Sequence, residues 1–111
     1  MANKKRAYSA RLEGGRLVFK EVEGYPVEIH GIPALAYKTE KMVQGERKMK
    51  KETGWYVIDI RTGLSFSAFC PTKKAAIESA LYRVGRYGVD KVLKLIENTV
   101  RQYGEAPKVG A

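Results

Sequence analysis

The feature that most constrains the fold is that helical periodicity is confined to the chain after Pro71, whereas residues 8–40 and 55–69 have the patterns of strands and turns. Apolar residues recur there at helical spacing in two stripes, first Ala76, Ile77, Ala80, Leu81 and Val84, then Val89, Val92, Leu93, Ile96, Val100 and Tyr103. Such stripes predict two amphipathic helices. Strands followed by segregated helices are typical of an α+β domain. The sequence therefore predicts an antiparallel β-sheet, made of N-terminal strands and hairpins, packed on one face by two C-terminal helices.

Capping residues set the expected ends of both helices. Thr72 is placed to begin the first helix, since its hydroxyl can accept a hydrogen bond from a free amide of the first turn. Gly85 and Gly88 bracket the end of that helix, and Gly104 and Pro107 end the second.

Glycine and proline mark the turns between the expected strands. Residues 8–12 and 16–22 flank a glycine pair, Gly14 and Gly15, which suits a tight hairpin. We expect a turn over residues 24–26, a half-buried strand over 27–30, a turn over 31–33, and an extended segment from Ala34 to Glu40.

A second hairpin is expected from the β-rich runs 55–61 and 64–69, which Thr62 and Gly63 join. Leu64, Phe66 and Ala68 should share the covered face of the later strand, with Ser65 and Ser67 on its other face.

Residues 41–53 differ from their surroundings, since they are rich in lysine and arginine and lack apolar periodicity. We interpret them as a basic flexible loop within a single domain spanning residues 1–111. Unstructured loops of about a dozen residues tend to be functional or disordered, and a plain solvated connection is an equal alternative. Residues 1–6 and 105–111 are interpreted as a basic N-terminal tail and a C-terminal tail.

Composition places the chain among ordinary globular proteins, with 44% hydrophobic and 30% charged residues, and a length of 111 residues suits one core. No stretch approaches the roughly 18 uninterrupted apolar residues of a membrane-spanning helix. No apolar segment follows the basic N-terminus as a signal peptide requires. Cys70 is the single cysteine, so no internal disulfide can form. These features predict a cytoplasmic protein that does not span a membrane.

Lys and Arg total 21 against 12 Asp and Glu, which gives a net charge of +9. The excess lies in both halves of the chain, 12 against 7 through Thr53 and 9 against 5 from Gly54 onward. A positive field of this size attracts polyanions and acidic protein surfaces. A high net charge can also serve solubility alone.

Several of these cations are expected to form one outward patch that contacts a partner. Four side chains should share the outer face of the second helix, and others flank Thr72 or lie within residues 41–53. The candidate binding residues are Lys73, Lys74, Lys91, Lys94, Asn98, Arg101, Arg47, Lys48, Lys50, Lys51 and Arg61. Seven tyrosines interleaved with this charge could stack on unpaired bases or anchor a protein interface.

Few residues could carry out catalysis. His30 is the only histidine, so neither a metal site with paired histidines nor a pairing of His30 with Cys70 is supported. Asp59 is the one acid that could act as an acid or base, although such a residue more often faces solvent or pairs with an arginine. The glycine pairs match no phosphate-binding or dinucleotide motif. The sequence predicts no enzyme, cofactor or metal, and an enzyme built around Asp59 or Cys70 stays an alternative.

Residues 55–80 carry a local resemblance. The pattern Trp55-x-Val57-x-Asp59-x-x-Thr62-Gly63, followed by a strand ending near Phe69 and by Thr72-Lys73-Lys74-x-Ala76, resembles the N-terminal DNA-binding domain of phage and transposon tyrosine integrases. The stretch also looks like a segment of small uncharacterised phage and mobile-element proteins. In the integrase domains, one helix backs a three-stranded sheet whose outer face reads DNA. The resemblance implies that Arg61, Ser65 and Ser67 would have that role.

Two functions from different classes follow. In the first, the protein is a small non-enzymatic basic module, of phage or mobile-element origin, that binds DNA or RNA through a cationic surface. In the second, it is a protein-binding inhibitor or adaptor, such as an anti-defence protein of the anti-CRISPR kind that acts on a host nuclease complex. The expected partner is nucleic acid or an acidic or nucleic-acid-binding host protein, and a homodimer also stays open.

Overall fold

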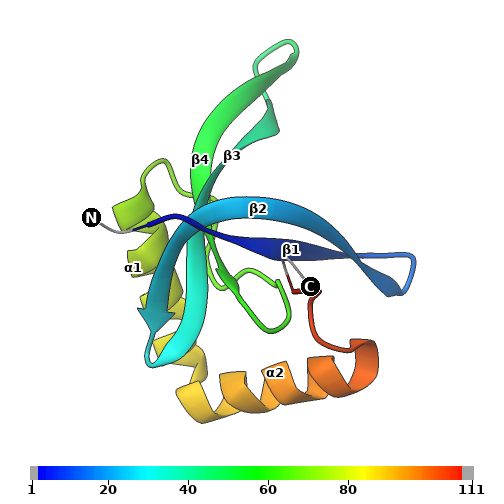
Figure 1. Cartoon of the computed structure of the whole chain (residues 1–111). Coiled ribbons are helices and arrows are strands. Elements are labelled where there is room, and N and C mark those ends of the chain that lie inside the picture. The colour runs from blue at the N-terminus through cyan, green and yellow to red at the C-terminus, as the bar shows by residue number, and fades with distance from the viewer. Residues whose placement is uncertain (1–2, 109–111) are drawn as a thin grey trace.

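The computed structural model describes residues 3–108 and contains four strands followed by two helices (Figure 1). The strands are β1 (Lys5–Glu13), β2 (Arg16–Ile29), β3 (Ile32–Gln44) and β4 (Met49–Asp59). The helices are α1 (Lys73–Tyr87) and α2 (Val89–Tyr103). The strands form one antiparallel sheet in the order β1-β2-β3-β4. The predicted α+β fold, an antiparallel sheet with two C-terminal helices, is confirmed.

The sheet is bent into two diverging hairpins, because β2 changes its partner at Gly24. The part of β2 before Gly24 pairs with β1, and the part from Gly24 to Ile29 pairs with β3. A Cβ atom at Gly24 would lie 2.2 Å from the carbonyl oxygen of Ala36, so the bend leaves no room for a side chain there. The β1–β2 and β3–β4 hairpins project in different directions (Figure 1). The turn predicted over residues 24–26 is wrong, since β2 continues through Pro26.

Residues with positive φ angles form the two tight turns that connect β1 to β2 and β2 to β3. Gly14 and Gly15 form the predicted β1–β2 turn, with φ angles of 57° and 82°. The β2–β3 turn lies at His30 (φ 50°) and Gly31 (φ 84°), slightly earlier than the predicted residues 31–33. The Nε2 atom of His30 lies 2.8 Å from the carbonyl oxygen of Leu81. Because a carbonyl oxygen only accepts, Nε2 is the donor, and this bond attaches the turn to α1.

Helix α1 begins where the sequence predicts. The hydroxyl of Thr72 accepts a 3.1 Å hydrogen bond from the amide of Ala75, which satisfies a free donor of the first turn. Three small or branched residues of α1 are buried against the sheet, and they are Ala76, Ala80 and Val84.

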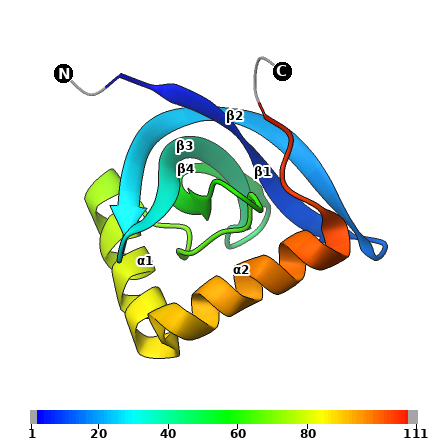
Figure 2. The same ribbon diagram turned by 60° about the horizontal axis from the view of Figure 1, so that its bottom comes forward.

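Helix α2 closes the same hydrophobic core from a second side. Val92 and Ile96 are buried in one cluster with the side chains of α1 and with Ala34, Ala36 and Val57 of the sheet. In Figure 2, α2 lies across the open side of the curved sheet and meets α1 at one end. No helix within residues 3–108 is long and apolar enough to cross a membrane.

The predicted second hairpin is confirmed only in part. β4 ends at Asp59, a turn follows, and the return segment 64–70 meets β4 at two isolated bridges instead of a regular ladder. The expected alternation also fails, because Ser67 is buried whereas Ala68 is exposed. The Ser67 hydroxyl accepts a 2.9 Å hydrogen bond from the amide of Val57, which holds that side chain inward.

Residues 41–53 are not the loop that their composition predicts. β3 continues to Gln44 and β4 begins at Met49, so these residues form the outer part of the β3–β4 hairpin around a turn at 45–48. Lys51 of one strand lies 3.9 Å from the carboxylate of Glu40 on the other. Both faces of this ribbon are largely polar, so it lacks the alternation by which a half-buried strand is recognised.

The two expected tails are partly ordered. Lys5 and Arg6 belong to β1, and the amide of Ala106 donates a 2.7 Å hydrogen bond to the carbonyl oxygen of Arg61. Ala106 is buried, so the chain after α2 returns to the turn that follows β4. Residues 1–2 and 109–111 of the predicted tails lie outside the described residues.

Candidate functional site

A cleft of about 540 Å³ lies between the two diverging hairpins. We name it the inter-hairpin cleft. Its floor is formed by Val22, Tyr37, Tyr56 and Ile58. These four residues belong to a second hydrophobic cluster, which also contains Ala7 and Leu35, on the face of the sheet opposite α1. One wall comes from the β1–β2 hairpin and includes Ser9, Arg11 and Lys20; the other comes from β3 and includes Thr39 and Lys41.

Three aromatic rings form a row that begins inside the cleft with Tyr37 and Tyr56 and continues beside it to Phe69. The ring centroid of Tyr56 lies 6.0 Å from that of Tyr37 and 5.2 Å from that of Phe69. Phe69 lies over Gly54, where a Cβ atom would come within 2.6 Å of its ring, so the glycine makes room for it. Tyr37 is 8% exposed and belongs to the floor, whereas Tyr56 and Phe69 are half-buried. Part of each of the latter two rings can therefore contact a ligand.

Lys41 holds a positive charge beside these rings. Its Nζ atom donates a 3.3 Å hydrogen bond to the hydroxyl of Tyr56 and lies 5.5 Å from the ring centroid of Phe69. A cation at this distance from an aromatic ring is attracted to it. The rings and the charge therefore form one combined surface.

The charge of the cleft lining is positive. It contains three cations, Arg11, Lys20 and Lys41, and one acid, Glu40, which is paired with a lysine of β4. Arg11 lies 3.0 Å from the carboxylate of Glu13. Within residues 3–108, Lys20 and Lys41 form no ion pair. These two lysines are available to an anionic partner.

The phenol of Tyr37 is kept neutral by its surroundings. Burial raises the pKa of Tyr37 above the usual value of 10.0, a hydrogen bond with Ser9 lowers it, and the nearby Tyr56 raises it further. Burial is the largest of these causes. Burial therefore disfavours the charged phenolate form of Tyr37.

The outer β3–β4 hairpin projects from the body of the protein (Figure 1) and carries further cations. Strand register places Lys41 and Lys50 on the same face of the hairpin. Lys50 lies 3.8 Å from the carboxylate of Glu52. Arg47 and Lys48 are exposed in the turn and form no ion pair with any residue that the structure describes. Cations thus continue from the cleft wall to the tip of the hairpin.

The predicted single patch of cations is wrong. Lys91, Lys94, Asn98 and Arg101 are exposed on α2, as the helical spacing predicts. However, α2 and the tip of the β3–β4 hairpin lie at opposite ends of the molecule (Figure 1). The helical spacing identifies which side chains point outward, but it does not fix where one element lies relative to another.

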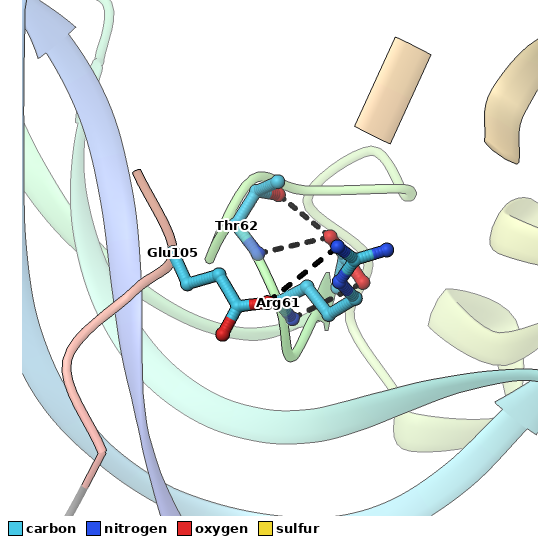
Figure 3. A network of polar contacts seen from close by, with 4 residues as sticks. Arg61, Thr62 and Glu105 are labelled. Atoms are coloured by element: carbon cyan, nitrogen blue, oxygen red, sulfur yellow. Dashed lines mark hydrogen bonds and ion pairs between the residues drawn. The ribbon is translucent and has the colours of Figure 1, made fainter. Parts of the chain in front are cut away.

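Two other candidates are engaged within the protein. The Nζ atom of Lys73 lies 4.2 Å from the ring centroid of Tyr25, which stacks on Trp55. Arg61 lies 3.5 Å from the carboxylate of Glu105 (Figure 3). Lys74, next to Lys73, is exposed.

Asp59 is buried, and its carboxylate is satisfied within its own turn. It accepts hydrogen bonds from the Thr62 amide (3.0 Å), the Thr62 hydroxyl (2.7 Å) and the Arg61 amide (3.3 Å). Figure 3 shows these contacts of Thr62 and Arg61, with Glu105 nearby. Because its carboxylate accepts three hydrogen bonds from one turn, Asp59 stabilises that turn.

The remaining chemical candidates are separate. His30 is engaged with α1, and the half-buried thiol of Cys70 lies 3.4 Å from the carbonyl oxygen of Ala68. Within residues 3–108, no three His, Cys, Asp or Glu side chains are grouped to hold a metal ion.

An apolar pocket of about 310 Å³ lies elsewhere, between α1, α2 and the segment after β4. Its lining includes Leu64, Phe66, Tyr87 and Leu95. Tyr87 and Leu95 are 55% and 53% exposed, so this pocket has an open apolar rim.

Sequence reasoning missed Lys20 and Phe69 as site residues, and it included Tyr56 only as one of the seven tyrosines that could stack on bases. Tyr37, Thr39 and Lys41 occupy alternate positions of one strand, so the sequence could have placed Tyr37, Thr39 and Lys41 on one face of the sheet. The bend at Gly24, which brings Lys20 opposite that face, has no signal in a local pattern.

Comparison with known proteins finds no family model, no curated protein and no solved structure that matches the chain. The integrase resemblance and the mobile-element origin therefore stay predictions. Of the residues that the resemblance implies, Ser67 is buried, Arg61 is ion-paired, and Ser65 lines the inter-hairpin cleft.

Proposed function

We propose that the protein is a non-enzymatic nucleic-acid-binding module whose contact surface is the inter-hairpin cleft together with the outer β3–β4 hairpin. The observation that supports this best is one concave surface that combines the half-buried ring of Tyr56 with Lys20 and Lys41, and the ring of Phe69 lies against Tyr56 beside it. Rings offer stacking to bases, and unpaired lysines attract phosphates. Neither the rings nor the lysines alone would select nucleic acid, but together they match the base and the phosphate of a nucleotide.

The outer hairpin supports the same proposal. It carries Arg47, Lys48, Lys50 and Lys51 on a narrow two-stranded ribbon that projects beyond the body of the protein. A ribbon of this kind can follow a phosphate backbone, and such contacts give affinity without reading sequence.

Binding should be measured with labelled generic DNA and RNA at low and moderate salt, because release of counterions makes such affinity fall steeply with salt. Two matched double variants test the surface. Lys20→Glu with Lys41→Glu reverses two cations in the cleft, and Lys91→Glu with Lys94→Glu reverses two on α2. We expect a large loss of affinity in the cleft variant and a small one in the α2 variant. Absence of binding at low salt would contradict the proposal, and a larger loss in the α2 variant would assign the contact to α2.

A second candidate function is that of a protein-binding inhibitor or adaptor, of which an anti-defence protein acting on a host nuclease complex is one form. The open apolar rim at Tyr87 and Leu95 favours it, because exposed apolar groups around a pocket are typical of protein contacts. A pull-down that captures one stoichiometric protein, lost in Leu95→Asp and kept in the Lys20→Glu, Lys41→Glu variant, would support this function.

A further inference from the structure

We infer that the inter-hairpin cleft accepts an unpaired strand, with one base against the rings of Tyr56 and Phe69 and the neighbouring phosphates along the outer β3–β4 hairpin. This inference rests on the proposed function and names the form of nucleic acid that the cleft would take.

The position of the rings carries the inference. Tyr56 lines a concave surface between two walls, and Phe69 lies against Tyr56 beside that surface. In a duplex the faces of the bases are stacked on one another, and proteins reach only base edges and backbone. A duplex therefore has no base face to offer to a ring inside a cleft, whereas an unpaired strand can turn a base outward and stack it.

The size of the cleft agrees with an unpaired strand as its ligand. Its volume of about 540 Å³ falls in the range of roughly 300–1,000 Å³ that is usual for sites enclosing small organic ligands. A nucleobase with its sugar is a ligand of that class. A B-form duplex, whose major groove alone is about 12 Å wide, is a convex body that would rest on the two rims.

The cations are placed to meet the backbone of such a strand. The Lys41 ammonium lies beside the rings themselves, at 3.3 Å from the Tyr56 hydroxyl, and Lys20 stands on the opposite wall. From Lys41 to the end of β3 at Gln44 the hairpin extends about 10 Å, at about 3.3 Å per residue. Arg47 and Lys48 lie at the end of this path. A base in the cleft would thus be followed by phosphates that run past these side chains.

The test measures fluorescence anisotropy of the full chain with a labelled single-stranded DNA, the blunt duplex of the same sequence, and an RNA strand of that sequence. We expect both single strands to bind more tightly than the duplex at the same salt concentration. A preference between the DNA and RNA strands would show whether the cleft also contacts the 2′-hydroxyl.

Substitution of one ring locates the stacked base. Tyr56→Leu keeps an apolar side chain in the floor but removes the ring, and it should weaken single-strand binding about five- to 150-fold, the range for loss of one base–aromatic stack. Tyr56→Phe keeps the ring and should retain most of the affinity. Tyr82→Leu is the matched control, because Tyr82 is 64% exposed on α1, away from the cleft. Phe69→Leu gives the same test if thermal unfolding shows that Tyr56→Leu is not folded.

Three outcomes are informative. Preference for single strands, with loss in Tyr56→Leu or Phe69→Leu and none in Tyr82→Leu, supports the inference. Equal or tighter binding of the duplex, with no effect of ring removal, overturns it and leaves the proposed function standing. Failure of all three nucleic acids to bind at low salt overturns both.

Discussion

The amide of Ala10 in β1 donates a 2.8 Å hydrogen bond to the carbonyl oxygen of Gly63 in the turn after β4. The bond links the first strand to the end of the last, and both residues line the inter-hairpin cleft. Among the strands of residues 3–108, β1 pairs with β2 alone, so this link holds the β1–β2 hairpin against the rest of the domain. The shape of the cleft therefore depends on the turn after β4.

Gly63→Ala should destabilise the protein. Gly63 has a φ of 79°, and a Cβ atom there would lie 2.5 Å from the carbonyl oxygen of Tyr8. Backbone strain alone costs about 1–3 kcal/mol, and the clash adds to it. Urea unfolding, followed by the fluorescence of Trp55, measures the loss. Gly104→Ala is the matched control, because Gly104 has a φ of 84° but nothing within 4 Å of the added atom. Equal losses in the two variants would contradict the role of the close contact.

Asp59→Ala should lower the free energy of unfolding because the buried amide and hydroxyl of Thr62 would lose their acceptor. The expected cost is about 1–3 kcal/mol for each donor left without a partner. Chemical denaturation provides the measurement. Glu97→Ala, which removes an exposed carboxylate from α2, is the control and should change stability little. A similar small effect in both variants would show that the Asp59 turn does not stabilise the fold.

Tyr37→Phe should make the protein less sensitive to alkaline pH. Burial raises the pKa of Tyr37, so the folded protein keeps this proton at pH values where the unfolded chain, with a pKa of 10.0, releases it. The unfolded state then binds fewer protons, and stability falls as the pH rises through 10.0 toward the raised pKa.

The measurement is the free energy of unfolding below and above pH 10.0, in the wild type and in Tyr37→Phe. The two curves should diverge only on the alkaline side, with the steeper decline in the wild type. Tyr82→Phe, which removes the hydroxyl of an exposed tyrosine on α1, is the control variant. Parallel curves for Tyr37→Phe and the wild type would contradict the burial of this phenol.

Arg47→Gln together with Lys48→Gln should weaken nucleic-acid binding without destabilising the fold, because both side chains are exposed in the hairpin turn. If each contacts one phosphate, the slope of log affinity against log salt should become shallower by about 1.4 on a single strand, at about 0.7 per phosphate. Affinity measured over a series of salt concentrations checks this. An unchanged slope would show that the tip of the hairpin does not contact the backbone.

The sequence predicts the fold class correctly because the strongest local signals agree with it. The Thr72 cap, the apolar stripes of the two helices and the Gly14–Gly15 turn each depend on residues that are close in the chain. Patterns of that kind can be read without knowledge of the three-dimensional packing.

The site was less accessible to sequence reasoning, because it depends on the pairing of distant segments. Lys20 and Lys41 come to one cleft only because β2 bends at Gly24, and this bend is set by close approach to Ala36. The outer β3–β4 hairpin was missed for another reason, since a ribbon with solvent on both faces does not require apolar residues at alternate positions.

The ribbon formed by the end of β3 and the start of β4 has a free edge. Within the described residues 3–108, positions 49–53 of β4 have β3 on one side and no strand on the other. An open edge of this kind invites pairing with the edge of another molecule and so favours aggregation. Lys50 and Lys51 place charge on that edge, and the charges of two approaching copies repel each other. Neutralising both lysines would therefore lower the solubility of the protein as well as its attraction for phosphate.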